Sequence, residues 1–214
     1  MTFTRVIDIR GVRQIAWGCL VVMMSVQAWA VADSSAASEP EKVVQVMTDQ
    51  LLKTARKNSD ALKKDPEPVY KEMETILEDL VSFKFIARNV MGDNYWKQAT
   101  DKQRDDFLSS FRRSLVVTLV KGMSQNLDFK IELLPDESKV NNNLATIVQK
   151  VSGPESSNMV VYTLGHGKSG QWKVLNVVLD GVNLGTTFRS QFAQGVKDNN
   201  GDLDATIAGW LSQG

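Results

Sequence analysis

Few residues of this sequence could do chemistry, and none of them stands in a known catalytic or metal-binding motif. The 214 residues include one histidine, His166, and one cysteine, Cys19, which excludes paired-histidine zinc sites and multi-cysteine clusters or disulfide frameworks. His166 lies in a Gly-rich turn, and Asp180 precedes Gly181 at the end of a predicted strand, both of which are typical turn positions. G-x-S-x-G, P-loop and dinucleotide-binding motifs are absent from the sequence. The sequence therefore predicts neither a metal nor a cofactor.

The other candidates for contact with a ligand are cations and aromatic residues on predicted helices. Four arginines could meet an anionic group, although each is also expected to be solvated or salt-bridged, and the sequence does not choose among them: Arg88, Arg112, Arg113 and Arg189. The pair Tyr95-Trp96 fits either helix packing or the lip of a cavity, where an aromatic ring with a polar tip is favoured.

The composition excludes two broad classes of protein. The 25 basic residues are balanced by 25 acidic ones, whereas nucleic-acid binders usually carry a basic excess. A hydrophobic content of 43% can form a core and argues against a disordered chain. We therefore expect a folded protein that does not bind nucleic acid.

Residues 1–32 have the three parts of a cleaved secretory signal. Basic residues are followed by the mostly apolar stretch 15–29 and by small-x-small cleavage sites that end at Ala30 or Ala32. A transmembrane anchor is the alternative, but the stretch is short for a span of about 20 residues. Lipid attachment at Cys19 is a second alternative, and this cysteine lies inside the apolar stretch. We expect a single domain over residues 33–214, exported from the cytoplasm.

Helices are predicted first along the mature chain. Ser38 with Glu41 and Thr100 with Gln103 are capping-box signals for helix starts, and Gly92 is a helix stop. Apolar residues at helical spacing predict helices at about 38–55, 69–80, 82–91, 100–125, 186–197 and 202–213. The second half of the helix at 100–125 is apolar around much of its circumference, which predicts burial on several sides.

Strands with period-two patterns lie between these helices. They cover about 129–133, 143–152, 158–165 and 171–179 and are separated by Gly, Pro and Asp turns. Short connections predict a four-stranded antiparallel meander, and the order of elements predicts an α+β fold. Both faces of the last two strands are apolar, with Trp172, Val174 and Val178 expected on one face of the last strand. Helices on both sides of the sheet, or an apolar ligand inside it, would cover these faces.

Several segments together resemble the toluene-tolerance/MlaC family. They are FKFIARNVMG (83–92), YWKQAT (95–100), QRDDF (103–107), FRRSL (111–115), GQWKVLNVVLDGVNL (170–184), FRSQF (188–192) and DLDATI (202–207). They keep the family's order and spacing across nearly the whole mature chain. No single segment is long, and the combination carries the resemblance.

The resemblance implies a periplasmic phospholipid carrier and a fold like that of nuclear transport factor 2. In this fold a curved antiparallel sheet and helices form a cone around an apolar cavity. The implied partners are phospholipid, an outer-membrane lipoprotein–porin complex, and an inner-membrane ABC transporter with an MCE-domain subunit. The carrier would maintain the lipid asymmetry of the outer membrane and would act as a monomer without a cofactor. A hopanoid is the alternative cargo within the family.

The cavity wall is predicted from the family segments and the apolar stripes. The candidate lining residues are Val90, Met91, Phe111, Leu115, Leu119, Val148, Val161, Trp172, Val174, Leu184, Phe188 and Phe192. A shift of strand register by one residue would turn each strand residue to the other face of the sheet.

Two other functions stay open at this point. Resemblance to steroid isomerases of the same cone fold implies an enzyme in which Asp180, with its pKa raised by an apolar cavity, is the base and Tyr162 a donor. A periplasmic chaperone or interaction module would instead expose an apolar patch and hold no lipid.

Overall fold

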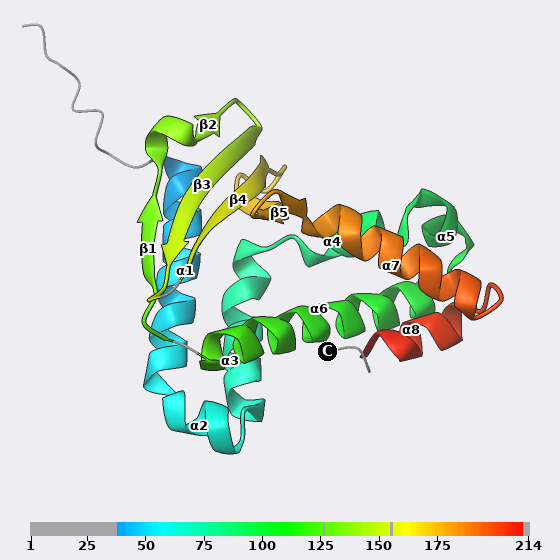
Figure 1. Ribbon diagram of the computed structural model, residues 1–214. Coiled ribbons are helices and arrows are strands. Elements are labelled where there is room, and N and C mark those ends of the chain that lie inside the picture. Colours follow the sequence, from blue (N-terminus) through cyan, green and yellow to red (C-terminus); the bar gives the residue numbers. More distant parts are fainter. Residues whose placement is uncertain (1–37, 126, 155, 212–214) are drawn as a thin grey trace, which may run out of the picture. The chain divides into compact units, whose positions relative to one another are not determined.

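Helices occupy the first half of the described chain, and an antiparallel sheet and two further helices follow (Figure 1). This computed structural model describes residues 38–125, 127–154 and 156–211, which belong to one compact unit spanning residues 36–214. The predicted signal segment lies outside the described residues. The helices are α1 (Glu39–Lys57), α2 (Ser59–Lys64), α3 (Glu67–Leu80), α4 (Phe83–Met91), α5 (Asp93–Gln98), α6 (Asp101–Gln125), η1 (Pro135–Glu137), α7 (Leu184–Asp198) and α8 (Leu203–Leu211).

The predicted helix ends are set by local hydrogen bonds. The Thr100 backbone N–H donates to Gln103 Oε1 at 2.9 Å, and the Gln103 N–H donates to Thr100 Oγ1 at 3.2 Å, which completes the capping box of α6. Gly92 ends α4 with φ at +79°, a backbone angle that side chains with a Cβ rarely adopt. The short helices α2 and α5 were not predicted, since each is too brief to show a clear period.

The sheet contains the four predicted strands and two strands of two residues each. Its strands are β1 (Lys130–Leu133), β2 (Lys139–Val140), β3 (Leu144–Ser152), β4 (Ser157–His166), β5 (Trp172–Leu179) and β6 (Val182–Asn183). The order is β1-β3-β4-β5-β6, and every pair is antiparallel. The short strand β2 also pairs with β3, at residues that β1 does not use. The α+β prediction is confirmed, with six strands in place of four.

A β-bulge changes which side chains of β5 face the helices. Thr163 pairs with Asn176 and Leu164 with Val174, which leaves Leu175 as the extra residue. An extra residue reverses the alternation of side chains beyond it. Val177 therefore joins Trp172 and Val174 on the helix-facing side of the sheet, while Val178 pairs with Val161 on the other side. The prediction that Val178 shares a face with Trp172 and Val174 was wrong for this reason.

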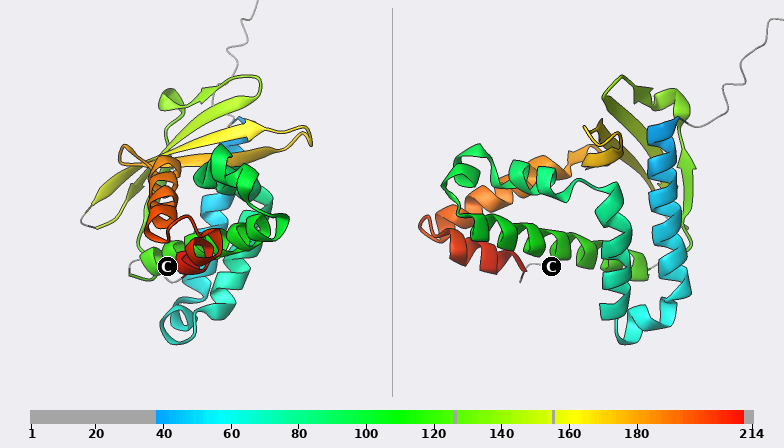
Figure 2. Two further views of the ribbon diagram at one scale, coloured as in Figure 1. Left: turned by 90° about the vertical axis from the view of Figure 1, so that its right-hand side faces the viewer. Right: turned by 180° about the vertical axis from the view of Figure 1, so that it is seen from behind.

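Two hydrophobic cores form within this unit. The first, which we call the sheet core, joins side chains of α1, α2, α3 and the second half of α6 to one face of the sheet. The rear view in Figure 2 shows α1 lying along the sheet. The second, the aromatic core, joins α4, α5, the first half of α6, α7 and α8. The buried residues of the aromatic core are Ala87, Val90, Met91, Ala99, Phe107, Phe111, Phe192, Val196, Ile207 and Trp210.

Helix α6 belongs to both cores and uses opposite sides of itself for them. Phe107 is buried in the aromatic core and Val116 in the sheet core. These residues are nine positions apart, which is two and a half turns of an α-helix and places them on opposite sides. The same interval separates Phe111 from Val120. This change of face explains why the sequence of α6 is apolar around much of its circumference.

Candidate functional site

A row of leucines on α6 lies where the two cores meet. Leu108 and Leu115 are partly buried and pack against both cores, and Leu119 is partly buried against the sheet core. Their spacing of seven and four residues keeps them on one stripe, about midway between the opposite sides that carry Phe107 and Val116. We call these three residues the leucine seam. Because the side chains are incompletely buried, the seam is an apolar surface that separation of the two cores would enlarge.

The structure gathers ten of the twelve predicted lining residues around the two cores and the start of α7. Val90, Met91, Phe111 and Phe192 are buried in the aromatic core, with Phe188 packed against it. Val174 is buried in the sheet core, with Leu119 and Trp172 packed against it, and Leu115 contacts both cores. Leu184 is half-buried as the first residue of α7 and belongs to neither core. Their contact with a lipid stays a prediction.

Val148 and Val161 lie on the other face of the sheet. They pair with each other across β3 and β4, and neither belongs to a core. The neighbouring residues Ile147 and Tyr162 point into the sheet core in their place. Period-two spacing states which residues share a face, but it does not state which face meets the helices. We leave these two valines out of the proposed site.

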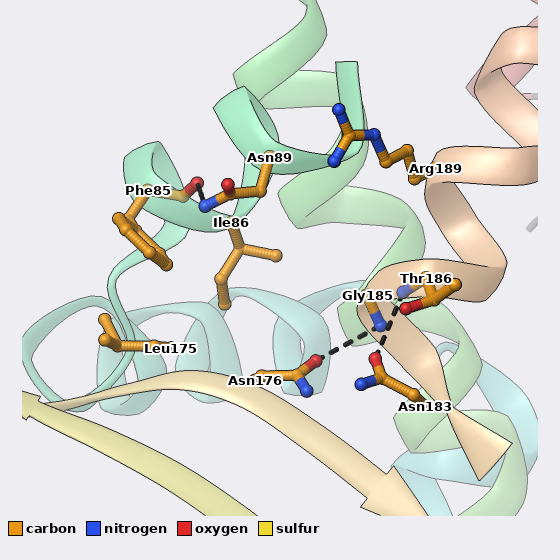
Figure 3. Close-up of a pocket in the computed structure, with 9 residues that line it drawn as sticks. All are labelled: Phe85, Ile86, Asn89, Leu175, Asn176, Asn183, Gly185, Thr186 and Arg189. Atoms are coloured by element: carbon orange, nitrogen blue, oxygen red, sulfur yellow. Dashed lines mark hydrogen bonds between the residues drawn. The ribbon is translucent and has the colours of Figure 1, made fainter. Parts of the chain in front are cut away.

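A cavity of about 240 Å³ lies between α4, β5 and the start of α7 (Figure 3). Its lining residues are Phe85, Ile86, Asn89, Leu175, Asn176, Asn183, Gly185, Thr186 and Arg189. Apart from Arg189, sequence reasoning did not single out these residues. The available signal was Asn176, an amide between the apolar residues Leu175 and Val177 of a predicted strand. A second cavity, of about 230 Å³, lies beside Trp96, Arg104 and Leu108.

The environments of the four candidate arginines distinguish one of them. Arg88 pairs with Asp93 at 3.4 Å and Arg112 with Glu78 at 3.1 Å, while Arg113 contacts Glu67 and Glu74. Arg189 has no acidic partner or hydrogen bond among the described residues, and it borders the 240 Å³ cavity. An unpaired guanidinium beside a cavity is suited to an anionic ligand.

Asp180 and Tyr162 do not form the base and donor of a cavity enzyme. Asp180 is exposed in the β5–β6 turn, where hydrogen bonds from the Asn158 side chain and the Met159 backbone N–H lower its pKa. Tyr162 is buried in the sheet core, and burial raises its pKa. A base working near neutral pH needs a carboxyl whose pKa is raised. The lowered pKa and the exposure of Asp180 indicate a structural role in the turn.

Replacement of Asp180 by asparagine tests this role through the dependence of stability on pH. A carboxyl whose pKa is lower in the folded state stabilises the protein above its unfolded pKa of about 3.9 and loses that contribution as the pH falls through the folded value. Asparagine tolerates the positive φ of 47° at this position and does not titrate. We expect the difference in Tm between wild type and Asp180→Asn to be constant from pH 7 to 5 and to shrink below pH 4. A constant difference down to pH 3 would contradict the assignment.

Two absences hold for the part of the chain that the structure describes. No group of three or more His, Cys, Asp or Glu side chains there is arranged to hold a metal ion. None of the helices described is long and apolar enough to cross a bilayer.

Comparison with known proteins gives concordant matches over most of the chain. The toluene tolerance protein ttg2D of Pseudomonas putida is 33% identical over 179 residues, which are 83% of this chain and 82% of that protein. The intermembrane phospholipid transport system binding protein MlaC of Haemophilus influenzae is 23% identical over 152 residues, 70% of this chain and 71% of that protein.

A solved structure shares the fold. The phospholipid-binding protein of Ralstonia solanacearum, determined in complex with a phospholipid, superimposes with a TM-score of 0.72 at 18% identity and covers 81% of this chain and 95% of that one. The model of the family described as MlaC protein matches residues 45–212. With this match and the 33% identity to the Pseudomonas protein, the chain belongs to the MlaC family.

Proposed function

We propose that this protein is a non-enzymatic phospholipid carrier, which holds the acyl chains of its cargo along the leucine seam between the two cores. The observation that carries the proposal is the division of one compact unit into two apolar cores that share α6. Membership of the MlaC family supports it, as do the names of two similar proteins, one of which is described as phospholipid-binding and the other as part of phospholipid transport.

The energetics of lipid transfer explain why a carrier needs such a surface. Exposure of acyl chains to water costs about 0.8 kcal/mol per methylene, or on the order of 24 kcal/mol for roughly thirty methylenes. A cavity of 240 Å³ is below the 300–1,000 Å³ of typical small-ligand pockets and cannot enclose two such chains. We therefore propose that the cores separate along Leu108, Leu115 and Leu119 when the chains enter.

The family supports a periplasmic location and two docking partners. The protein would receive or deliver lipid at an outer-membrane lipoprotein–porin complex and at an inner-membrane ABC transporter with an MCE-domain subunit, and so maintain outer-membrane lipid asymmetry. Export would use residues 1–32 as a cleaved signal, with residues 33–214 as the lipid-binding domain. A shuttle between two membranes is expected to be a monomer.

Lipid analysis of the exported protein tests the proposal. The full chain is expressed in a Gram-negative host, purified from the periplasm without detergent, weighed by native mass spectrometry and extracted with solvent. We expect a mature N-terminus after Ala30 or Ala32 and a stoichiometric diacyl phospholipid. A released hopanoid would keep the carrier but change its cargo. A folded protein without lipid, and without uptake from phospholipid vesicles, would contradict the proposal.

A further inference from the structure

We infer that the cavity between α4, β5 and α7 binds the phosphate group of an amphiphile and thereby selects phospholipids over neutral lipids. This inference rests on the proposed carrier function and adds to it a site for the head of the cargo. Some polar groups of the cavity are already hydrogen-bonded to the protein, and others remain free to bind a ligand.

Two asparagine side chains in the cavity lining have free N–H donors, because only their oxygens are hydrogen-bonded to the protein. Asn176 Oδ1 accepts the Gly185 N–H at 3.2 Å, and Asn183 Oδ1 accepts the Thr186 N–H at 3.1 Å, as the dashed lines in Figure 3 show. These bonds fix the orientation of each amide, since only oxygen can accept from a backbone N–H. In both side chains the Nδ2 atom has no hydrogen bond to another described residue. Figure 3 shows the two side-chain amides next to each other, with their Nδ2 atoms in the gap that separates the two residues.

The contact of Asn176 with α7 is close enough to require a glycine. A Cβ atom built on Gly185 would lie 2.7 Å from Asn176 Oδ1, which is far inside normal contact distance. The amide of Asn176 therefore sits where a side chain of residue 185 would otherwise be. This packing holds the donors of β5 beside the start of α7.

Arg189 provides the positive charge. Its guanidinium lies against Gly92, where a Cβ atom would be 3.2 Å from Nη2 and 3.4 Å from Nε. Gly92 is buried, and its missing side chain leaves room for the arginine between α4 and α7. Among the nine lining residues none is acidic, so an incoming anion meets no like charge. Asn89 Nδ2 donates to the Phe85 carbonyl at 2.8 Å, which leaves Asn89 Oδ1 as an acceptor for a headgroup hydroxyl or ammonium.

The other wall of the cavity is apolar. Phe85 is 47% exposed although it is a phenylalanine, and Ile86 and Leu175 lie beside it in the lining. Free donors and a cation on one side and apolar side chains on the other match a phosphate joined to hydrocarbon. The volume of about 240 Å³ suits the head of a lipid better than its chains.

This arrangement predicts selection by lipid class and not by headgroup. The phosphate is common to all glycerophospholipids, whereas diacylglycerol and hopanoids lack it. Hydrogen bonds to a charged group contribute about 1.5–3 kcal/mol, which corresponds to roughly tenfold to hundredfold in affinity. Loss of Arg189 should therefore weaken phospholipid binding by about that factor and leave the binding of a neutral two-chain lipid unchanged.

The test compares Arg189→Gln with Arg88→Gln, which removes the same charge from a salt-bridged arginine of α4 outside the cavity lining. Uptake is measured from vesicles that contain either fluorescent phosphatidylglycerol or fluorescent diacylglycerol with matched chains, and circular dichroism verifies folding. We expect Arg189→Gln to weaken phosphatidylglycerol uptake about tenfold or more, with diacylglycerol uptake unchanged. Arg88→Gln should behave as wild type.

A second variant removes a donor without removing the contact to α7. Asn176→Asp keeps the oxygen that accepts the Gly185 N–H and replaces the N–H donor with a second, charged oxygen. Repulsion of the phosphate should weaken phosphatidylglycerol uptake by at least as much as Arg189→Gln. Inorganic phosphate, titrated calorimetrically, identifies the source of the anion. It should bind at least about tenfold more weakly than the lipid, because it lacks the contacts of the apolar wall.

Each remaining outcome has a definite meaning. Equal phosphatidylglycerol uptake by the Arg189→Gln and Arg88→Gln proteins would overturn the phosphate site while the carrier function stands. Arg189-dependent binding of inorganic phosphate as tight as that of lipid would also overturn it, since the site would then serve a free anion. A wild-type protein that takes up neither lipid would remove the carrier function and the inference together.

Discussion

Replacement of Phe107 by alanine is expected to lower the free energy of unfolding by about 3–5 kcal/mol, the range found for truncation of buried phenylalanines. Phe107 has no exposed surface and is central to the aromatic core. Its ring centre lies 4.8 Å from that of Phe192, 5.5 Å from that of Trp210 and 5.7 Å from that of Phe111. Truncation removes all three contacts and leaves a cavity that the helices around it can only partly close. The loss is large against a total stability of about 5–15 kcal/mol.

The matched control is Phe85→Ala, the same chemical change at a phenylalanine that is 47% exposed. Truncation there should cost roughly 1 kcal/mol or less, because much less apolar surface leaves a packed environment. Urea denaturation followed by tryptophan fluorescence measures both values. Similar midpoints for the two variants would contradict the view that α4, α6, α7 and α8 are held together by the aromatic core.

Replacement of Leu115 by aspartate is expected to abolish the co-purification of phospholipid while the protein stays folded. Leu115 packs against both cores and is only partly buried, so a carboxylate at this position can reach water as long as no acyl chain covers it. Acyl chains along the seam would bury that charge without a partner, which costs several kcal/mol. We expect the affinity for phospholipid to fall by about a hundredfold or more.

The control for this experiment is Val46→Asp, which places the same charge at an apolar residue of α1 that is 45% exposed. This variant should retain stoichiometric lipid in native mass spectra. Retention of lipid by a folded Leu115→Asp protein would show that the chains do not lie along the leucine seam. Loss of lipid by both variants would point to a general effect of charge, and the proposed location of the chains would be wrong.

Features that depend on neighbours in the chain were predictable from the sequence. The start of α6 follows from Thr100 and Gln103, whose reciprocal hydrogen bonds span three residues. The end of α4 follows from Gly92, whose positive φ excludes most other residues. The four long strands follow from period-two patterns bounded by turns. The resemblance to the MlaC family was likewise contained in short segments, and the matching family model confirmed it.

Features that depend on distant partners were not predictable in this way. Whether Arg112, Arg113 or Arg189 is free depends on where acidic residues far along the chain come to lie. Glu78, for example, pairs with Arg112 from another helix. The amide of Asn176 has a fixed orientation only because Gly185, nine residues later, offers its N–H to the amide oxygen.

The sequence by itself determined the types of elements, most of their boundaries, the α+β class and the family, because these depend on local geometry and on the linear order of residues. Tertiary structure alone decided which side chains meet. The bulge at Leu175 turned Val177 toward the helices, and α6 presents opposite sides to two cores. Packing selects one face of a strand or helix by the total apolar area that it buries, and this total is a property of the whole fold that no single segment contains.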